Sequence, residues 1–182
     1  AIGRGHARAV QGDVSVVADE LIAEVRTRSD GANEVYRVFA QGNVTMKSAS
    51  ETATGPAAVY DFDKQVLVLE GDPVALVSAD GKVSAHQALQ YWSNEGVAVA
   101  EGAAYAEDKN RHKLYGDKLI AFFRQAGTAK SGGGVNGKRG DINYVQGFGN
   151  VRMDTASEII RAERGAYNID NGLATLEGSV KV

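Results

Sequence analysis

Histidines are the residues of this chain that most readily support metal binding or acid–base catalysis. The chain has three, His6, His86 and His112, and they form neither an H-x-H nor an H-E-x-x-H pattern. A metal or acid–base site would need the fold to gather them. Without a ligand spacing we interpret them as surface or turn residues, and we expect no metal and no cofactor.

Two further arrangements contain residue types used in hydrolysis. Ser84-Ala85-His86 lacks the G-x-S-x-G elbow of serine hydrolases. The carboxylates Asp19, Asp117 and Glu163 occupy equivalent positions and could be paired glycosidase acids. Short acceptors at a bend more often bond free backbone amides. We therefore predict a structural role for these carboxylates, and a protein that is not an enzyme.

Residues 125–141, QAGTAKSGGGVNGKRGD, are glycine-rich and basic. They could form a lid or a phosphate cradle, but a phosphate loop needs a helix behind its glycines. The next residues, Ile142-Asn143-Tyr144-Val145, indicate a strand. We therefore expect a flexible insertion at about 125–141, and its role stays open.

Composition restricts the class of protein. The 182 residues are 43% hydrophobic and 24% charged, which is ordinary for one folded domain spanning residues 1–182. The net charge of −3 gives no support for a nucleic-acid partner. No apolar run reaches the length of a membrane-spanning helix. Without cysteine there are no disulfides and no thiolate ligands.

The elements that must position any site are organised as internal repeats. GNVTMKSASE, which begins at Gly42, returns as GNVRMDTASE at Gly149. Repeats of about 30 residues are marked by a glycine before an alternating segment and by a small residue 13 or 14 positions later. The glycines are Gly5, Gly42, Gly71, Gly102, Gly149 and Gly178, and the small residues are Ala18, Gly55, Ala85, Gly116 and Ala162.

The small residue is predicted to be a corner in a strand. The segments VVADELIAEV, VSAHQALQYW, LYGDKLIAFF and IRAERGAYNI align on it without gaps. Apolar residues lie two positions before it and seven after it, and this odd separation would place them on opposite faces of a strand. A bulge at the small residue would return both to one face. The same alignment favours a strand over a helix for ADELIAEVRTR, which begins at Ala18.

Short turns separate the predicted strands. Asp63-Lys64, Asp80-Gly81, Asn94-Glu95-Gly96, Asp108-Lys109-Asn110 and Asp170-Asn171-Gly172 carry typical turn residues. They recur roughly every 15 residues, which favours antiparallel up-and-down strands. The prediction is an all-β fold.

The apolar residues allow two interpretations, a packed core or an open groove for acyl chains. Three segments, VYRVFA, VLVL and VAVA, are apolar on both faces of their predicted strands. One alternating register is shared by Val44, Met46, Leu76, Val151 and Met153. Small residues such as Ala23 and Ala58 would leave room for a ligand. We also predict a column of bulky residues at one repeat position: Val25, Phe62, Trp92, Phe123 and Ile169.

Three stretches resemble hallmarks of the OstA-like (LptA) family. GHARAVQGDVSVVADELIAEV, from Gly5 to Val25, resembles its opening motif. GPAAVYDFDKQVLVL, from Gly55 and followed by Gly71, resembles its second hallmark, and residues 83–91 and 114–123 resemble its later corner. The resemblance covers residues 5–123, and the repeat at Gly149 extends it. The usual strands before the first motif are absent, and the insertion at 125–141 is unusual.

This resemblance implies an open, twisted β-jellyroll with a V-shaped, acyl-lined interior. It implies a non-catalytic periplasmic protein that binds the lipid A part of lipopolysaccharide and stacks end to end between the inner and outer membranes. The implied partners are lipopolysaccharide, further copies in a head-to-tail homo-oligomer, and the OstA-like domains of the inner-membrane and outer-membrane transport components. We expect the lipid to contact Val14, Val16, Val44, Met46, Phe62, Leu76, Trp92, Phe123, Val151 and Met153.

Other functions stay open at this point. The chain could be the amino-terminal domain of the outer-membrane lipopolysaccharide translocon. It could instead be a repeat-based polysaccharide-binding protein, which would need exposed aromatic platforms, whereas Tyr60, Tyr91 and Tyr167 are scattered among apolar positions. A third option is an assembly module with a solid core. The sequence ends in Gly178-Ser-Val-Lys-Val, which we expect to begin a strand whose unpaired edge could join another copy.

Overall fold

The computed structural model describes residues 1–11, 14–49, 51–79, 81–124, 142–155 and 157–182, and they form thirteen strands and no helix. The all-β prediction is confirmed. The bounds are β1 Ile2–Gln11, β2 Val14–Thr27, β3 Asn33–Lys47, β4 Glu51–Asp61, β5 Val66–Glu70, β6 Val74–Ser78, β7 Gly81–Ala85, β8 Ala88–Trp92, β9 Val97–Asp108, β10 Lys113–Phe123, β11 Ile142–Asp154, β12 Ile159–Asn168 and β13 Leu173–Glu177. Within these described ranges, no helix suited to crossing a membrane is found.

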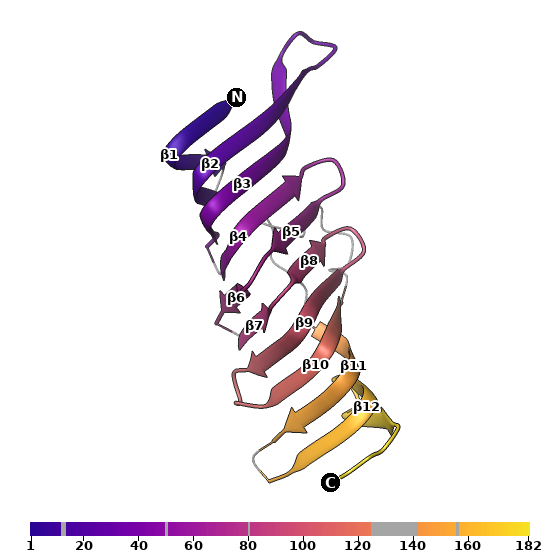
Figure 1. The fold of residues 1–182 in the computed structure, drawn as a ribbon. Helices are drawn as coiled ribbons and strands as arrows, with labels where there is room; N and C mark the ends of the chain where they lie inside the picture. The colour runs from indigo at the N-terminus through magenta and orange to yellow at the C-terminus, as the bar shows by residue number, and fades with distance from the viewer. Residues whose placement is uncertain (12–13, 50, 80, 125–141, 156) are drawn as a thin grey trace.

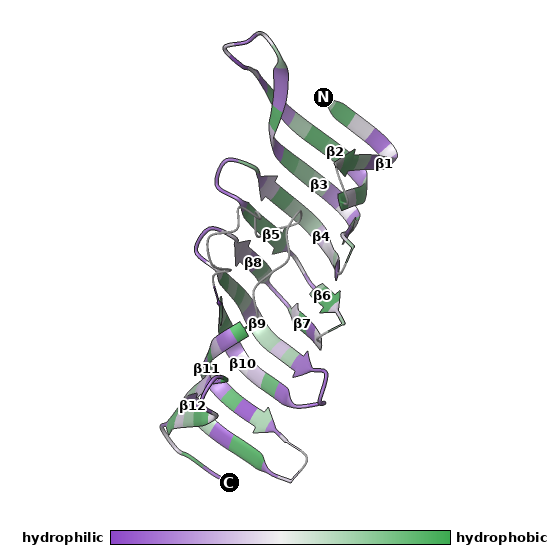
Figure 2. Ribbon diagram, turned by 180° about the vertical axis from the view of Figure 1, so that it is seen from behind, coloured by the Kyte–Doolittle hydropathy of each residue, from purple (hydrophilic) through white to green (hydrophobic). Residues whose placement is uncertain are grey.

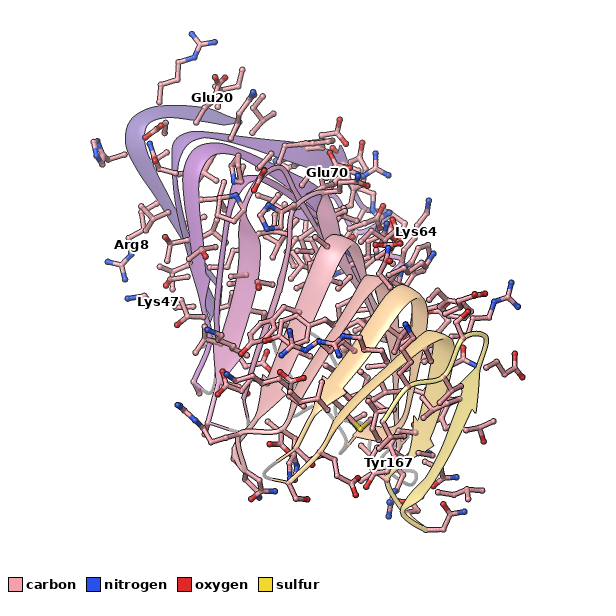
Figure 3. All side chains as sticks on the ribbon, turned by 60° about the horizontal axis from the view of Figure 1, so that its bottom comes forward. Arg8, Glu20, Lys47, Lys64, Glu70 and Tyr167 are labelled. Carbon is pink, nitrogen blue, oxygen red and sulfur yellow. The ribbon has the colours of Figure 1, made fainter. Side chains whose placement is uncertain are left out.

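All strand pairs are antiparallel, and the order in the sheet is β1-β2-β3-β4-β5-β8-β9-β10-β11-β12-β13, while β6 and β7 pair with each other and join β4 to β9. Figure 1 shows the labelled strands β1 to β12 arranged along the length of the molecule. The sheet is an open, twisted β-jellyroll in which the long strands bend over, as Figure 3 shows near Glu20 and Glu70. The bend divides the sheet into two limbs. The first limb contains residues 14–18, 44–47 and 51–54 with β6 and β7, and the second contains residues 20–27, 35–41 and 57–61 with β5 and β8.

The bend is built from glycine-led bulges that recur along the chain. Gly42 and Asn43 both have positive φ, 76° and 49°, and so do Gly149 and Asn150, 68° and 50°. The strand pairing shifts register at these sites, with the extra residue in the glycine-bearing strand. The predicted bulge therefore exists, but it lies opposite the small residue of the neighbouring strand, not at that residue.

The corner carboxylates clip these bulges in place. The Asn43 side-chain amide donates to Asp19 at 2.8 Å, the Asn150 amide donates to Asp117 at 3.0 Å, and the Ser179 hydroxyl donates to Glu163 at 3.0 Å. Sequence reasoning assigned these carboxylates a structural role but named backbone amides as donors. The donors that the structure shows are side chains, from the next strand for Asn43 and Asn150 and from just beyond β13 for Ser179.

The gapless alignment of the corners is wrong at one repeat, and Trp92 changes face as a result. The residue packed against Gly102 is Gln87, whereas Asp19, Pro56, Asp117 and Glu163 directly follow their small residues. VSAHQALQYW therefore contains one extra residue between β7 and β8. Side chains alternate along a strand, so Leu89 and Tyr91 face the core and Trp92 faces outward.

The other residues of the predicted bulky column also lie in different environments. Phe62 and Phe123 pack against the core, whereas Val25 and Ile169 are 46% and 43% exposed. The prediction of one bulky column is thus wrong.

The strand prediction for residues 18–27 is confirmed by β2. Asp80 and the insertion at 125–141 lie outside the described residues. Beyond Gly178, the structure shows one bridge, Lys181 to Arg161, in place of the expected strand.

The core fills the middle of the molecule between the limbs. Leu69 of the second limb and Val74 and Val44 of the first limb are almost fully buried. The buried cluster extends from Ala18 to Leu119, so it occupies the space between β2 and β10. The interior is therefore solid near the centre.

Candidate functional site

A cavity of about 520 Å³ lies between the limbs at the β1–β4 end of the molecule. This volume falls within the range of roughly 300–1,000 Å³ that is usual for small-molecule sites. The lining residues are mostly apolar: Ala9, Val10, Val14, Val16, Ala23, Arg28, Asn33, Glu34, Val35, Val38, Ala40, Met46, Ala58, Tyr60 and Phe62. The structure thus has both a packed core and an open apolar space.

The walls of the cavity come from both limbs. From the first limb, β2 supplies Val16 and β3 supplies Met46, and β1 beside them supplies Val10. From the second limb, β3 supplies Val38 and β4 supplies Tyr60. Alanine at positions 23, 40 and 58 keeps the second wall thin, because a methyl group leaves space that a larger side chain would fill. The Tyr60 and Phe62 rings meet edge to face at 4.7 Å.

The cavity has a polar end beside the turn between β2 and β3. Arg28, Asn33 and Glu34 line it there, and Arg28 pairs with Asp30 at 3.5 Å. Arg26 next to them bonds Asp63 and Glu34, and these two hydrogen bonds raise the pKa of its guanidinium. An amphipathic ligand could therefore bury its apolar part and keep its polar part near charged groups.

The structure brings together some of the predicted contact residues. Val14, Val16, Met46 and Phe62 line the cavity, as expected for a shared interior face. Leu76 lines a second space of about 20 Å³ together with Met46, Leu67 and Tyr91.

The other predicted residues lie elsewhere. Val44 is 1% exposed within the core, and Phe123 packs edge to face on Tyr91 at 5.6 Å. Val151 and Met153 belong to β11 near the opposite end of the molecule. Trp92 is on the outer face, 38% exposed, so it takes no part in this interior.

Sequence reasoning missed half of the wall. Val35, Val38, Ala40 and Tyr60 line the cavity from the second limb, and Ala9 and Val10 line it from β1. The available signal was the alternation of side chains after each small residue. Leu21 and Ala23 lie three and five positions after Ala18, and both face inward. The sequence analysis instead chose residues seven positions after each small residue, such as Val25 and Phe123, and these lie towards the ends of the strands.

A partly buried ion pair supports the outer side of the second wall. Asp61 is 8% exposed, and Arg37 donates to it at 2.8 Å and 3.2 Å. Burial raises the pKa of the Asp61 carboxyl, but the Lys64 backbone amide and the Arg37 guanidinium outweigh that effect. The pKa therefore lies below its ordinary value.

Replacing Asp61 with asparagine should lower the free energy of unfolding by about 1.5–3 kcal/mol at neutral pH, the usual cost of losing hydrogen bonds to a charged group. The folded pKa is depressed, so the contribution of Asp61 is present above its unfolded pKa of about 3.9 and is lost as pH falls through the folded pKa. Urea denaturation at pH 7 and pH 3 should show the wild type and the variant converging at low pH. Asp63→Asn is the control, because Asp63 is 48% exposed and its pair should contribute under about 1 kcal/mol. A gap that is equally large at both pH values would contradict the assignment.

The histidines are not gathered by the fold. His6 is in β1, His86 pairs with Asp72 at 2.8 Å, and His112 pairs with Asp108 at 2.9 Å. Among the residues that the structure describes, no cluster of three or more His, Asp or Glu side chains could hold a metal ion.

Comparison with known proteins gives likenesses of fold but none of sequence. The sequence matches no protein-family model, and no curated protein sequence matches it. The structure is similar to the crystal structure of LptH from Pseudomonas aeruginosa, described as the LptA-homologous periplasmic component of the lipopolysaccharide transport device. That similarity has 17% sequence identity and a TM-score of 0.45, and it covers 59% of this chain and 73% of that chain.

Proposed function

We propose that this protein is a non-catalytic lipid carrier that holds acyl chains of lipopolysaccharide in the cavity between the two limbs. The observation that carries the proposal is the open space of about 520 Å³ with apolar walls from β1–β4. Motifs that resemble the OstA-like family, quoted above from Gly5 to Val25 and from Gly55 to Gly71, support the choice of lipid.

The energetics suit binding without a reaction. Each methylene moved from water into an apolar site contributes about 0.8 kcal/mol. A chain of about twelve carbons would thus gain up to roughly 10 kcal/mol before the cost of ordering it is subtracted. The protein has a net charge of −3, so affinity should come from the acyl chains more than from head-group phosphates. Arg28 at the polar end is the cation best placed to meet a phosphate.

The periplasmic location and the partner domains in the two membranes belong to the same proposal and rest on the sequence resemblance. Head-to-tail assembly has one structural support: among the strands that the structure describes, β1 and β13 each pair with a single neighbour, and such edges can pair with another chain. Sedimentation velocity at rising concentration would check it, since assembly should increase the mean sedimentation coefficient.

Photo-crosslinking should separate the cavity from the outer surface. A small diazirine amino acid placed at Met46, which lines the cavity, should capture lipopolysaccharide when the purified protein is loaded and irradiated. The matched position is Lys47, the next residue, which points outward from the first limb (Figure 3). We expect strong labelling from position 46 and background labelling from position 47. Equal labelling at both positions would contradict binding in the cavity.

A further inference from the structure

An unusual feature of the second limb is an apolar area on the outer face of its β8–β11 part. Trp92, Val97, Phe122 and Tyr144 are cross-strand neighbours on β8, β9, β10 and β11 and form one row. Their inward neighbours Tyr91 and Phe123 belong to the core side, so this row is on the opposite side of the sheet. Antiparallel sheets usually present polar residues on the face that is not in the core. Figure 2 shows the adjoining strand β5 in green for most of its length.

The row carries three aromatic rings that are partly exposed. Trp92 is 38% exposed, and Phe122 and Tyr144 are half-buried with ring centroids 5.8 Å apart. Neighbouring strands are about 4.8 Å apart, so Trp92 and Phe122, which flank β9, are separated by roughly 10 Å. The rings therefore form a strip across four strands, not a single contact point.

A second row beside the first adds amide groups. Gln90, Val99, Ile120 and Gln146 are cross-strand neighbours two residues further along the same strands. The Trp92 indole N–H donates to the Gln90 side-chain oxygen at 3.3 Å, which orients that amide beside the aromatic strip. None of these eight side chains carries a formal charge at neutral pH. Charges begin in the following row, where Lys118 pairs with Glu101 at 2.7 Å.

We propose that this outer face binds an extended, uncharged glycan. Sugar rings present C–H faces that stack on aromatic side chains and hydroxyl groups that bond to amides. A strip of three rings flanked by two glutamines offers both kinds of contact along one line. The site is separate from the cavity, because it is on the other side of the sheet and on β8–β11 instead of β1–β4.

The lack of charge favours this occupant over others. A nucleic acid or an anionic glycan needs cations along its path, and the two rows supply none on β8–β11. Further along the Trp92 row, Arg37 is neutralised by its pair with Asp61. An anionic membrane surface attracts lysine and arginine around an apolar patch, whereas the next row carries a neutralised Lys118–Glu101 pair. Amides within the strip fit a ligand rich in hydroxyl groups better than a purely apolar one.

Trp92 provides the measurement, because it is the single tryptophan of the chain. Titration of the full chain with cellohexaose and with chitohexaose, both neutral β-linked hexasaccharides, should change its emission saturably with at least one of them. Phe122→Ala should weaken the apparent affinity by roughly tenfold or more. Gln146→Ala should also weaken the apparent affinity. This second variant tests the same face if Phe122→Ala unfolds the sheet. Tyr115→Ala is the matched control, since Tyr115 is an aromatic residue of the same strand on the first limb and should leave the affinity unchanged.

Several results would overturn the proposal. One is the absence of any emission change with both hexasaccharides. Another is an equal loss of affinity in Tyr115→Ala and Phe122→Ala when circular dichroism shows both to be folded. A response to oligogalacturonate or to phosphatidylglycerol vesicles in place of the neutral sugars would assign the face to an anionic partner. An emission change produced by protein concentration alone would assign it to contacts between copies.

Discussion

Replacing Ala23 with tryptophan should reduce lipopolysaccharide binding by roughly tenfold or more while the protein stays folded. Ala23 is on β2 and lines the cavity, so a bulky ring at this position would occupy the space proposed for acyl chains. Because the side chain would enter an open volume of about 520 Å³, it should not overpack the core as a large residue at Ala18 would. Binding can be measured by displacement of a fluorescent lipopolysaccharide, and folding by circular dichroism.

Ile22→Trp is the matched control for this substitution. Ile22 is the preceding residue of β2, is 36% exposed and faces away from the cavity. The same ring added there should leave the affinity within about twofold of the wild type. If both variants bind normally, the cavity is not the lipid site. If both lose binding equally, the effect does not come from filling the cavity.

Alanine at Gly42 should destabilise the protein by about 2–4 kcal/mol, which is large for the addition of one methyl group. Gly42 has φ of 76°, a conformation that costs L-residues about 1–2 kcal/mol. A Cβ there would collide with an Asp19 carboxylate oxygen and would lie 2.9 Å from the Asp19 Cβ. Asp19 would have to move, and its hydrogen bond with Asn43 would be lost. Urea denaturation of the purified protein measures the change.

Gly172→Ala separates the two causes. Gly172 has a similar φ of 69° in the turn between β12 and β13, but a Cβ there meets nothing within 4 Å. Its substitution should therefore cost only the backbone term of about 1–2 kcal/mol. Equal destabilisation of both variants would show that the Asp19–Asn43 clip contributes nothing to the bend.

The sequence by itself determined the class of fold and the rhythm of its elements. Alternating residues and turn residues such as Asn94-Glu95-Gly96 specify antiparallel strands, because both act through local backbone geometry. The recurring glycines marked each repeat, but the bulge was predicted at the small residue. The structure places it at Gly42 and Gly149, where the left-handed conformation is a local demand. The side-chain clips between Asp19 and Asn43 were not predicted, because they join different strands.

Only the tertiary structure decided which apolar residues face a cavity, the core or solvent. One extra residue before β8 reverses the face of Trp92, because side chains alternate with a period of two and no local property of Gln87 reveals the shift. The limbs meet tightly at Leu69 and Val74 yet stand apart beside Ala23 and Ala58. That difference depends on how two halves of a bent sheet approach each other. Alternation records that a face is apolar, but the distance to the opposite wall is set by contacts between strands far apart in the chain.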